Sequence, residues 1–254
     1  MYELWGVPST TITGYSAGIS NWTKCMLYCY ELESCVAVYN ASCLVFTYGN
    51  IHSVNHKYGS RIAIKTISPD DGCDVDPYGE KTIELSDDLS YNISITESEY
   101  TFTYSLNCDD NWAMFNRYGD YWCIGVFPDD LLVRTSALES CQSLNATFSG
   151  PNTSIERKFI WNAASGSVVW VDGEQLSSCQ GLLGDPGCEG TEAYAFTDPL
   201  LIAKTGYVFA SLQPDGVEQE GYGTQACLVM LASSYFDDTW CAIQYGYVCG
   251  KLAE

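Results

Sequence analysis

The chain has 254 residues, which is enough for one large domain or two ordinary ones. Its formal net charge of -21, from 11 basic and 32 acidic side chains, would repel nucleic acid and anionic membrane surfaces. Its 13 cysteines contain no Cys-x-x-Cys pair, which favours disulfides and an oxidising compartment over a reduced cytosol.

Asn-x-Ser/Thr sequons recur along the chain, and with this cysteine content they predict a secreted glycoprotein. The sequons are at Asn21, Asn40, Asn92, Asn145 and Asn152. No run of about 18 apolar residues is present, so membrane insertion is not expected. Met1 is not followed by an apolar segment, and we therefore expect a signal peptide to lie upstream or to have been removed.

The amino-terminal region predicts a helix fastened to a small sheet by cysteines. A helix is expected over residues 22–32, with Cys25 and Cys29 one turn apart on one face. Short strand-like runs follow at residues 36–39, 44–46 and 61–64. Together with Cys35 and Cys43, these cysteines allow three disulfide connectivities, and the sequence does not choose among them.

This cysteine pattern is similar to that of a known domain family. The run Trp22-x2-Cys25-x3-Cys29-x5-Cys35-x7-Cys43, closed by Ile62-Ala63-Ile64-Lys65, resembles a PAN/apple-type domain. The resemblance implies a disulfide-stapled domain over residues 1–67 that binds proteins or carbohydrate.

Residues 68–104 are predicted as a linker and a strand that enters the next domain. The segment 68–91 is rich in Asp, Pro, Gly and Ser, which favours turns. From Asn92 the chain alternates, with Phe102 and Tyr104 on one side of an expected edge strand. With an odd number of cysteines, Cys73 is the candidate for an unpaired thiol. It would either link two chains into a covalent dimer or remain a free or capped thiol.

The carboxy-terminal region, residues 105–254, predicts two helices and several strands. Capping boxes at Ser136-x-x-Glu139 and Thr153-x-x-Glu156 mark the helix starts. Strands are expected at residues 168–173, 207–209, 228–231 and 245–248. A long loop separates the first two of these strands and contains a candidate pair, Cys179 and Cys188. Within this loop, Asp198 is a candidate auxiliary Ca2+ ligand, but it is rather expected to cap a turn before Pro199.

The order of residues in this second region resembles a long-form C-type lectin-like domain. The resemblance rests on Gln213-Pro214-Asp215, the acid pair Asp237-Asp238 before Cys241, the strand Val168–Gly173, and Tyr247-Val248-Cys249-Gly250. It implies disulfides Cys141–Cys249 and Cys227–Cys241, and a hairpin cystine between Cys108 and Cys123. The whole chain is thus predicted as α+β: a PAN/apple-like domain, then a lectin-like fold with two helices, antiparallel sheets and a long loop region.

The same resemblance implies a Ca2+ site whose coordination is completed by sugar hydroxyls. The implied metal ligands are Gln213, Asp215, Gln225, Asp237 and Asp238. Carboxylate and amide oxygens are the ligands that Ca2+ prefers. Gln225 stands where the family usually has Glu, and Glu218 and Glu220 are alternatives to it. Tyr222, Tyr235 and Phe236 are candidates to lie against the sugar ring.

The sequence therefore predicts an extracellular, Ca2+-dependent lectin whose partners are glycans or glycoproteins. Gln-Pro-Asp leans towards galactose-type ligands in the resembled family, where innate immunity is a common role. The alternative hypothesis is a metal-independent module for protein binding or adhesion, favoured by Gln225 and by the lengthened loop after Gln213. An enzyme is not expected, because the lectin-like region contains no histidine, and His52 and His56 are interpreted as surface residues.

Overall fold

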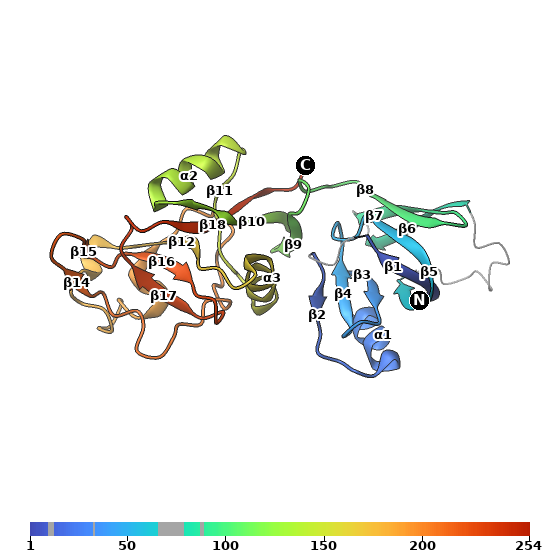
Figure 1. Cartoon of the computed structure of the whole chain (residues 1–254), viewed down its shortest axis with the longest axis horizontal. Helices are drawn as coiled ribbons and strands as arrows, with labels where there is room; N and C mark the ends of the chain where they lie inside the picture. Colours follow the sequence, from blue (N-terminus) through green and yellow to red (C-terminus); the bar gives the residue numbers. More distant parts are fainter. Residues whose placement is uncertain (10–12, 33, 66–78, 87–88) are drawn as a thin grey trace. The chain divides into compact units, whose positions relative to one another are not determined.

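The computed structural model describes residues 1–9, 13–32, 34–65, 79–86 and 89–254. Within them the chain forms two compact units (Figure 1), which are treated separately below. The first unit comprises Met1–Asn116 and Ala253–Glu254, and the second comprises Arg117–Leu252. Cys73 lies outside the described residues. No helix of the described part is long and apolar enough to cross a bilayer.

The first unit is a sheet with one helix. The strands are β1 (Tyr2–Pro8), β2 (Tyr15–Ser16), β3 (Cys35–Tyr39), β4 (Leu44–Thr47), β5 (Ser53–Ile64), β6 (Gly79–Ser86), β7 (Leu89–Ile95) and β8 (Glu99–Tyr104). They lie in the order β2-β4-β3-β5-β8-β7-β6, and β1 pairs antiparallel with β5. Side chains at the centre of this sheet, such as Val36, Val38 and Ile62, are fully buried, because β-branched residues pack well on a pleated surface.

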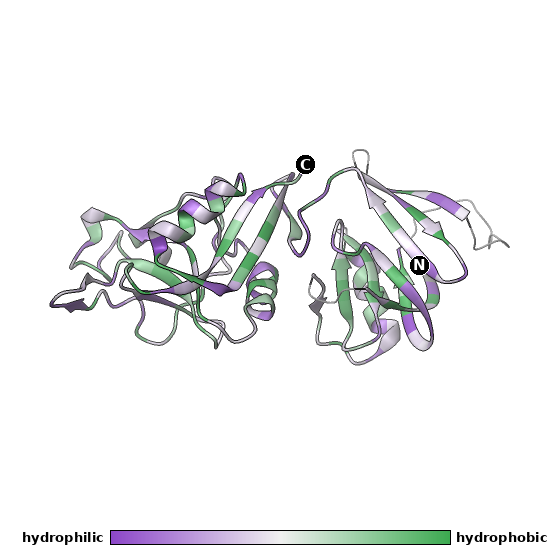
Figure 2. Ribbon diagram, turned by 45° about the horizontal axis from the view of Figure 1, so that its top comes forward, coloured by the Kyte–Doolittle hydropathy of each residue, from purple (hydrophilic) through white to green (hydrophobic). Residues whose placement is uncertain are grey.

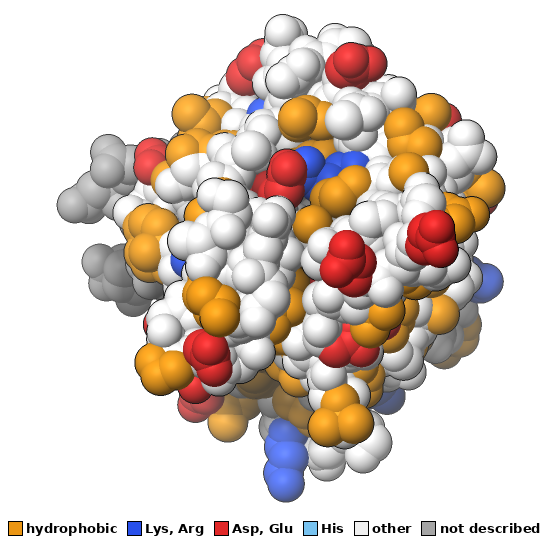
Figure 3. Space-filling model, turned by 90° about the vertical axis from the view of Figure 1, so that its left-hand side faces the viewer, with side chains coloured by type: hydrophobic (Ala, Val, Ile, Leu, Met, Phe, Trp, Pro, Cys, Tyr) orange, Lys and Arg blue, Asp and Glu red, His pale blue; other side chains and the backbone are white. Residues whose placement is uncertain are grey.

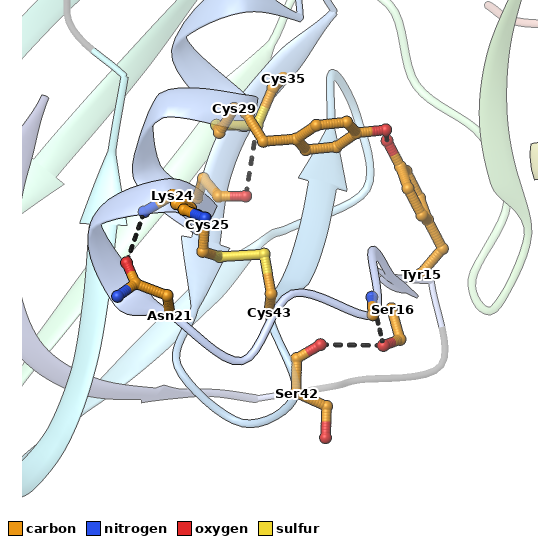
Figure 4. The surroundings of a disulfide bond; sticks show 12 residues. Tyr15, Ser16, Asn21, Lys24, Cys25, Cys29, Cys35, Ser42 and Cys43 are labelled. Carbon is orange, nitrogen blue, oxygen red and sulfur yellow. Dashed lines mark hydrogen bonds between the residues drawn. A yellow bond between two sulfur atoms is a disulfide. The ribbon is translucent and has the colours of Figure 1, made fainter.

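Helix α1 (Trp22–Glu31) is fixed at both ends of its buried face by disulfides. Asn21 caps the helix, because its side chain accepts a hydrogen bond from the Lys24 N–H at 3.0 Å. Figure 4 shows Cys25 bonded to Cys43, and Cys29 bonded to Cys35. The structure thus selects one of the three connectivities that the sequence left open.

Strands β6, β7 and β8 differ from the sequence prediction of a linker with an entering strand over residues 68–104. They extend the sheet of the first unit, where β8 pairs with both β5 and β7. The alternation at Phe102 and Tyr104 does mark a strand, but its apolar face packs into the first unit. The Tyr104 hydroxyl donates to the Ile51 carbonyl at 2.6 Å, which secures this placement.

The second unit is built on a sheet with the central order β17-β16-β12-β18-β10. The chain enters it through β9 (Ala113–Arg117) and continues as β10 (Asp120–Leu132), α2 (Arg134–Ser143), β11 (Thr147–Phe148), α3 (Ser154–Ala164) and β12 (Val169–Gln175). It then forms the short helices η1 (Ser177–Cys179) and η2 (Gly190–Ala193), followed by β13 (Tyr194–Ala195), β14 (Glu218–Gln219), β15 (Gly223–Thr224), β16 (Cys227–Met230), β17 (Phe236–Thr239) and β18 (Tyr245–Leu252).

The core of the second unit forms around Trp170 on β12, which is fully buried. Its indole N–H donates to the Leu132 carbonyl at 2.8 Å, so the one polar atom of the ring is satisfied. Figure 2 shows hydrophobic residues gathered along the strands of this unit. The α+β fold predicted from the sequence, with two helices and antiparallel pairs in this unit, is confirmed.

Three of the disulfides predicted for the carboxy-terminal region are also present. Bonds join Cys141 to Cys249, Cys227 to Cys241 and Cys179 to Cys188. Cys108 and Cys123 are both disulfide-bonded.

One of the two predicted capping boxes is present and one is wrong. Thr153 and Glu156 form the predicted box at the start of α3. The box at Ser136 and Glu139 does not exist, because α2 already begins at Arg134. The Arg134 N–H donates to the Cys241 carbonyl at 3.2 Å, so a tertiary contact satisfies a first-turn donor without a side-chain cap.

A buried ion-pair network joins the long loop to β9 and α3. The Arg117 guanidinium contacts Glu156 at 2.9 Å and Asp198 at 2.7 Å, and all three side chains are buried. Asp198 also accepts from the Leu200 N–H at 3.0 Å, which confirms its predicted turn-capping role. Burial raises the pKa of the neighbouring Asp172 to about 6, although backbone N–H groups of Asp198 and Thr197 oppose the shift.

The sequon at Asn152 is placed where a glycan does not fit. Asn152 is 3% exposed, and its Nδ2 donates to the Tyr118 hydroxyl at 3.2 Å. Its Oδ1 accepts from the N–H groups of Ala203 and Lys204 at 2.8 and 3.1 Å. Because both ends of the amide are engaged in the interior, the predicted glycosylation of Asn152 is incompatible with the folded unit.

Candidate functional site

Two segments that are separate in the sequence converge near the carboxyl end of the second unit. Asp237 and Asp238 lie on β17, which pairs with β16 through Val229 and Leu228. The carboxylate of Asp238 accepts from the Asp215 N–H at 3.0 Å and from the Gly216 N–H at 2.7 Å. The loop that carries Gln213 and Asp215 is therefore bound directly to β17.

A disulfide and a strand pair fix β17, the strand that carries the acid pair. The bond between Cys227 and Cys241 joins the start of β16 to the residues just after β17. Beside it, the Ala226 N–H donates to the Thr239 carbonyl at 3.1 Å. The ends of the two strands are thus fixed covalently and by hydrogen bonds, which preorganises the acid pair.

The loop before β14 makes its own contacts around Asp215. Gln213 Nε2 donates to Asp215 Oδ2 at 3.2 Å, and the Val217 N–H donates to Asp215 Oδ1 at 3.2 Å. The peptide bond between Gln213 and Pro214 is cis. Gln213 Oε1 is buried and has no hydrogen-bond partner among the described residues. An amide oxygen in this state is an acceptor whose hydrogen-bonding capacity is unused.

Asp237 is the second residue here with an unsatisfied atom. Its Oδ1 is buried and has no hydrogen-bond partner among the described residues. Burial raises the pKa of Asp237 to about 6, and repulsion from Asp238 and Asp215 adds to the shift. Burial also raises the pKa of Asp238, while the two backbone N–H donors that bind its carboxylate oppose that rise.

Gln225 and the hairpin β14–β15 stand beside the loop. The Gln225 N–H donates to the Val217 carbonyl at 3.0 Å, which extends the pairing of Glu218 with Thr224. The structure therefore brings the backbone of Gln225 close to Asp215. Glu218, the alternative ligand, lies exposed on β14.

The aromatic residues near the acid pair differ in exposure. Phe236 is 0% exposed, and its ring packs 4.6 Å from that of Tyr207. The prediction that Phe236 lies against a sugar ring is therefore wrong, because the residue belongs to the core. Tyr222, by contrast, is 55% exposed, and its ring lies 5.8 Å from that of Trp240. Sequence reasoning missed Trp240, although its position directly before Cys241 places it next to the acid pair.

Figure 3 views the end of the second unit that carries β14 and β15. Acidic side chains are dispersed there among exposed hydrophobic ones. The loop contributes Leu212 and Val217 to the exposed hydrophobic residues. This mixture of acceptors and apolar surface suits a ligand that has both hydroxyl groups and apolar faces.

The donor atoms fit a hard cation in type, because all are oxygens, but the predicted set of five ligands is not assembled. Asp238 and Asp215 already direct their carboxylates to N–H donors of the loop. In the part of the chain that the structure describes, no group of three His, Cys, Asp or Glu side chains is placed to hold a metal. Gln213 Oε1 and Asp237 Oδ1 alone fall short of the six to eight oxygens that Ca2+ takes.

Comparison with known proteins agrees with the two resemblances. The family model described as a PAN-like domain matches residues 1–66. No curated protein matches the chain.

Several solved structures are similar to the carboxy-terminal part. One is the cow C-type carbohydrate-recognition domain of CD23, in the presence of GlcNAc2Man3 oligosaccharide. Its sequence identity is 19%, the match covers 59% of this chain and 98% of that chain, and the TM-score is 0.45. Another is the mouse scavenger receptor C-type lectin carbohydrate-recognition domain. Its sequence identity is 14%, the match covers 58% of this chain and 100% of that chain, and the TM-score is 0.44. A third is the herring type II antifreeze protein. Its sequence identity is 20%, the match covers 58% of this chain and 100% of that chain, and the TM-score is 0.43. The chain thus begins with a PAN-like domain, and its structural neighbours are C-type lectin-like domains.

Proposed function

We propose that the second unit is an extracellular carbohydrate-binding module whose ligand hydroxyls bind Gln213 and Asp237. The observation that carries this proposal is a pair of buried oxygen atoms, Gln213 Oε1 and Asp237 Oδ1, that come from separate segments and have no donor within the described residues. A buried acceptor without a donor costs about 1–3 kcal/mol. Sugar hydroxyls are donors of the right kind, so their binding would recover that cost.

The hairpin next to these acceptors supplies an aromatic surface. Tyr222 lies in the turn between β14 and β15 and packs near Trp240, whose indole N–H donates to the Gly223 carbonyl at 2.9 Å. An exposed ring held in this way can cover the apolar face of a sugar without much loss of side-chain entropy. The disulfides of both units support secretion, since such bonds persist in oxidising compartments.

A glycan array with the purified full chain tests the proposal. The array is run once with Ca2+ and once with chelator, on the unmodified chain and on D215A, D237A and the control D129A. Asp129 is an exposed acid on β10, away from the loop in sequence. We expect glycan binding that D237A abolishes and D129A preserves, with thermal midpoints showing that each variant folds.

Comparing the array run with Ca2+ and the array run with chelator also shows whether glycan binding depends on calcium. Binding that persists in chelator is expected if hydroxyls contact Gln213 and Asp237 directly. Loss in chelator with recovery on adding Ca2+ would instead restore the Ca2+-dependent, galactose-type hypothesis. A chain that binds no glycan under either condition would reject carbohydrate recognition.

The second candidate function is a metal-independent protein-binding module. It is favoured by Leu212, which is 91% exposed at the start of the same loop. A glycan-negative array together with a protein partner that L212E releases would support this function.

A further inference from the structure

A buried pair of polar residues lies at the end of β12, outside the predicted site. Gln175, the last residue of β12, stands opposite Tyr194 of β13 in the strand register. The Gln175 N–H donates to the Ala226 carbonyl at 2.8 Å, and the Leu176 N–H donates to the Ala193 carbonyl at 2.8 Å. Gln175 is therefore held between β13 and the segment that leads into β16.

Gln175 lies near the loop of the candidate site, and Tyr194 is connected to its strand through Phe209. A Cβ atom built on Gly216 would lie 3.8 Å from Gln175 Nε2, and the Gly216 N–H is bound to Asp238. The Tyr194 ring stacks with the Phe209 ring at 6.4 Å between centroids. Phe209 bridges in turn to Phe236, the residue before Asp237. Gln175 thus lies close to the segment that carries Gln213, and Tyr194 is connected through Phe209 to the segment that carries Asp237.

The polar atoms of this pair are unsatisfied. Tyr194 is 4% exposed and Gln175 is 7% exposed, yet the Tyr194 hydroxyl and Gln175 Oε1 have no hydrogen-bond partner among the described residues. Gln175 Nε2 donates to the Cys179 carbonyl at 3.4 Å, which leaves the amide oxygen as the free end. Buried polar groups are nearly always paired, so a concentration of unpaired ones needs a cause.

The electrostatics of the region keep the Tyr194 hydroxyl protonated. Burial raises the pKa of Tyr194 far above its usual value, and repulsion from Asp238, Asp237 and Asp215 adds to the rise. Tyr194 therefore brings a hydrogen-bond donor to a place where the other unsatisfied atoms, on Gln175, Gln213 and Asp237, are acceptors.

We infer that Tyr194 and Gln175 form the buried floor of the carbohydrate site, and that Tyr194 donates a hydrogen bond to a ligand hydroxyl whose own hydrogen goes to Asp237. A hydroxyl can donate and accept at the same time, which is what this set of atoms requires. The site then discriminates against a sugar that lacks this one hydroxyl, since two buried partners would be left unpaired. The inference rests on the proposed function and adds the residues that set its specificity.

The test combines Y194F with monodeoxy sugars. Methyl galactoside and methyl mannoside, each with its set of monodeoxy analogues, are titrated into the unmodified chain and into Y194F. We expect Y194F to bind the preferred parent sugar roughly tenfold more weakly, as for the loss of one hydrogen bond. One deoxy analogue should bind Y194F and the unmodified chain equally, because it lacks the hydroxyl that Tyr194 contacts.

Thermal unfolding separates this role from a structural one. Y194F removes an unsatisfied hydroxyl, so its midpoint should stay unchanged or rise. The matched control is Y207F, which removes the bond from the Tyr207 hydroxyl to the Asp172 carbonyl at 2.7 Å. Y207F should lower the midpoint by a few degrees and leave the affinity unchanged.

Each remaining outcome overturns the inference in a recognisable way. If Y194F binds the parent sugar as tightly as the unmodified chain does, Tyr194 does not bind the ligand and the inference is rejected. The proposed function then still stands. If Y194F lowers affinity and midpoint together, as a core defect would, Tyr194 is structural. If the unmodified chain binds neither sugar nor any glycan on the array, the proposed function fails, and the inference fails with it.

Discussion

The side chain of Asp238 holds the backbone of Asp215, with Oδ1 3.0 Å from the Asp215 nitrogen and Oδ2 2.7 Å from the next nitrogen along the loop. The neighbouring acid, Asp237, instead has a buried oxygen, Oδ1, without a hydrogen-bond partner among the residues that the structure describes. Successive side chains of a strand point to opposite faces, which explains how two adjacent carboxylates meet different surroundings. Asp238 is therefore an anchor for the loop, whereas one carboxylate oxygen of Asp237 has no donor in the described part of the chain.

Replacing Asp238 by alanine should destabilise the second unit. The change leaves the N–H groups of Asp215 and Gly216 without their acceptor, at a cost of about 1–3 kcal/mol for each that stays buried. Chemical denaturation measures the free energy of unfolding, and D129A provides the reference for loss of an exposed charge. A cost of D238A no larger than that of D129A would show that the loop does not depend on this anchor.

Stability should fall as pH rises from about 4 to about 7. Burial raises the pKa of both Asp172 and Asp237 from 3.8 to about 6, so the folded unit binds these protons more tightly than the unfolded chain does. Their contribution is fully present below pH 3.8 and is lost as pH rises through about 6. Thermal midpoints across this range measure the effect.

The variant D237N isolates the part of this pH dependence that belongs to Asp237. Its midpoint should fall less steeply than that of the unmodified chain, because one titrating group with a raised pKa is gone. D129N serves as the control and should keep the full slope. Equal slopes for D237N and the unmodified chain would contradict the electrostatic description of the acid pair.

Removing the positive charge of Arg117 should lower the free energy of unfolding strongly. In R117M the carboxylates of Glu156 and Asp198 remain buried without a partner charge, which should cost about 3–5 kcal/mol. R61M is the matched control, since Arg61 pairs with Glu3 on the surface and should be worth less than about 1 kcal/mol. Denaturant titration of both variants decides this, and similar values for the two would refute it.

Glycosylation should occur at sequons whose asparagine is exposed, and not at a sequon whose asparagine is buried. Asn40 and Asn145 are exposed, whereas Asn152 is buried with its amide engaged at both ends. Mass spectrometry of chain secreted from a glycosylating host should find glycan at Asn40 and Asn145, and an unmodified Asn152 peptide. N145Q should lower the mass by one glycan, while N152Q should leave the glycan mass unchanged. A glycan on folded Asn152 would contradict the packing around it.

Local patterns in the sequence were sufficient for those elements whose signals are local. The capping box at Thr153 and Glu156, the buried strand around Trp170 and the alternation at Phe102 and Tyr104 all correspond to elements of the structure. The box at Ser136 failed because a tertiary bond from Arg134 to Cys241 starts the helix earlier. Alternation identified β8 as a strand, but alternation carries no information about which sheet a strand joins.

The sequence by itself determined the number and order of the cysteines, the acidic charge and the two segments that carry the acids and amides of the candidate site, because these depend on residue type and order. Only the tertiary structure decided that Phe236 belongs to the core, that Asp238 is occupied by the loop backbone, and that Asn152 is enclosed. It also paired Gln175 with Tyr194 and placed Gln175 close to Gly216 of the loop. Burial and hydrogen-bond partners depend on neighbours far along the chain, and residue order alone does not encode them locally.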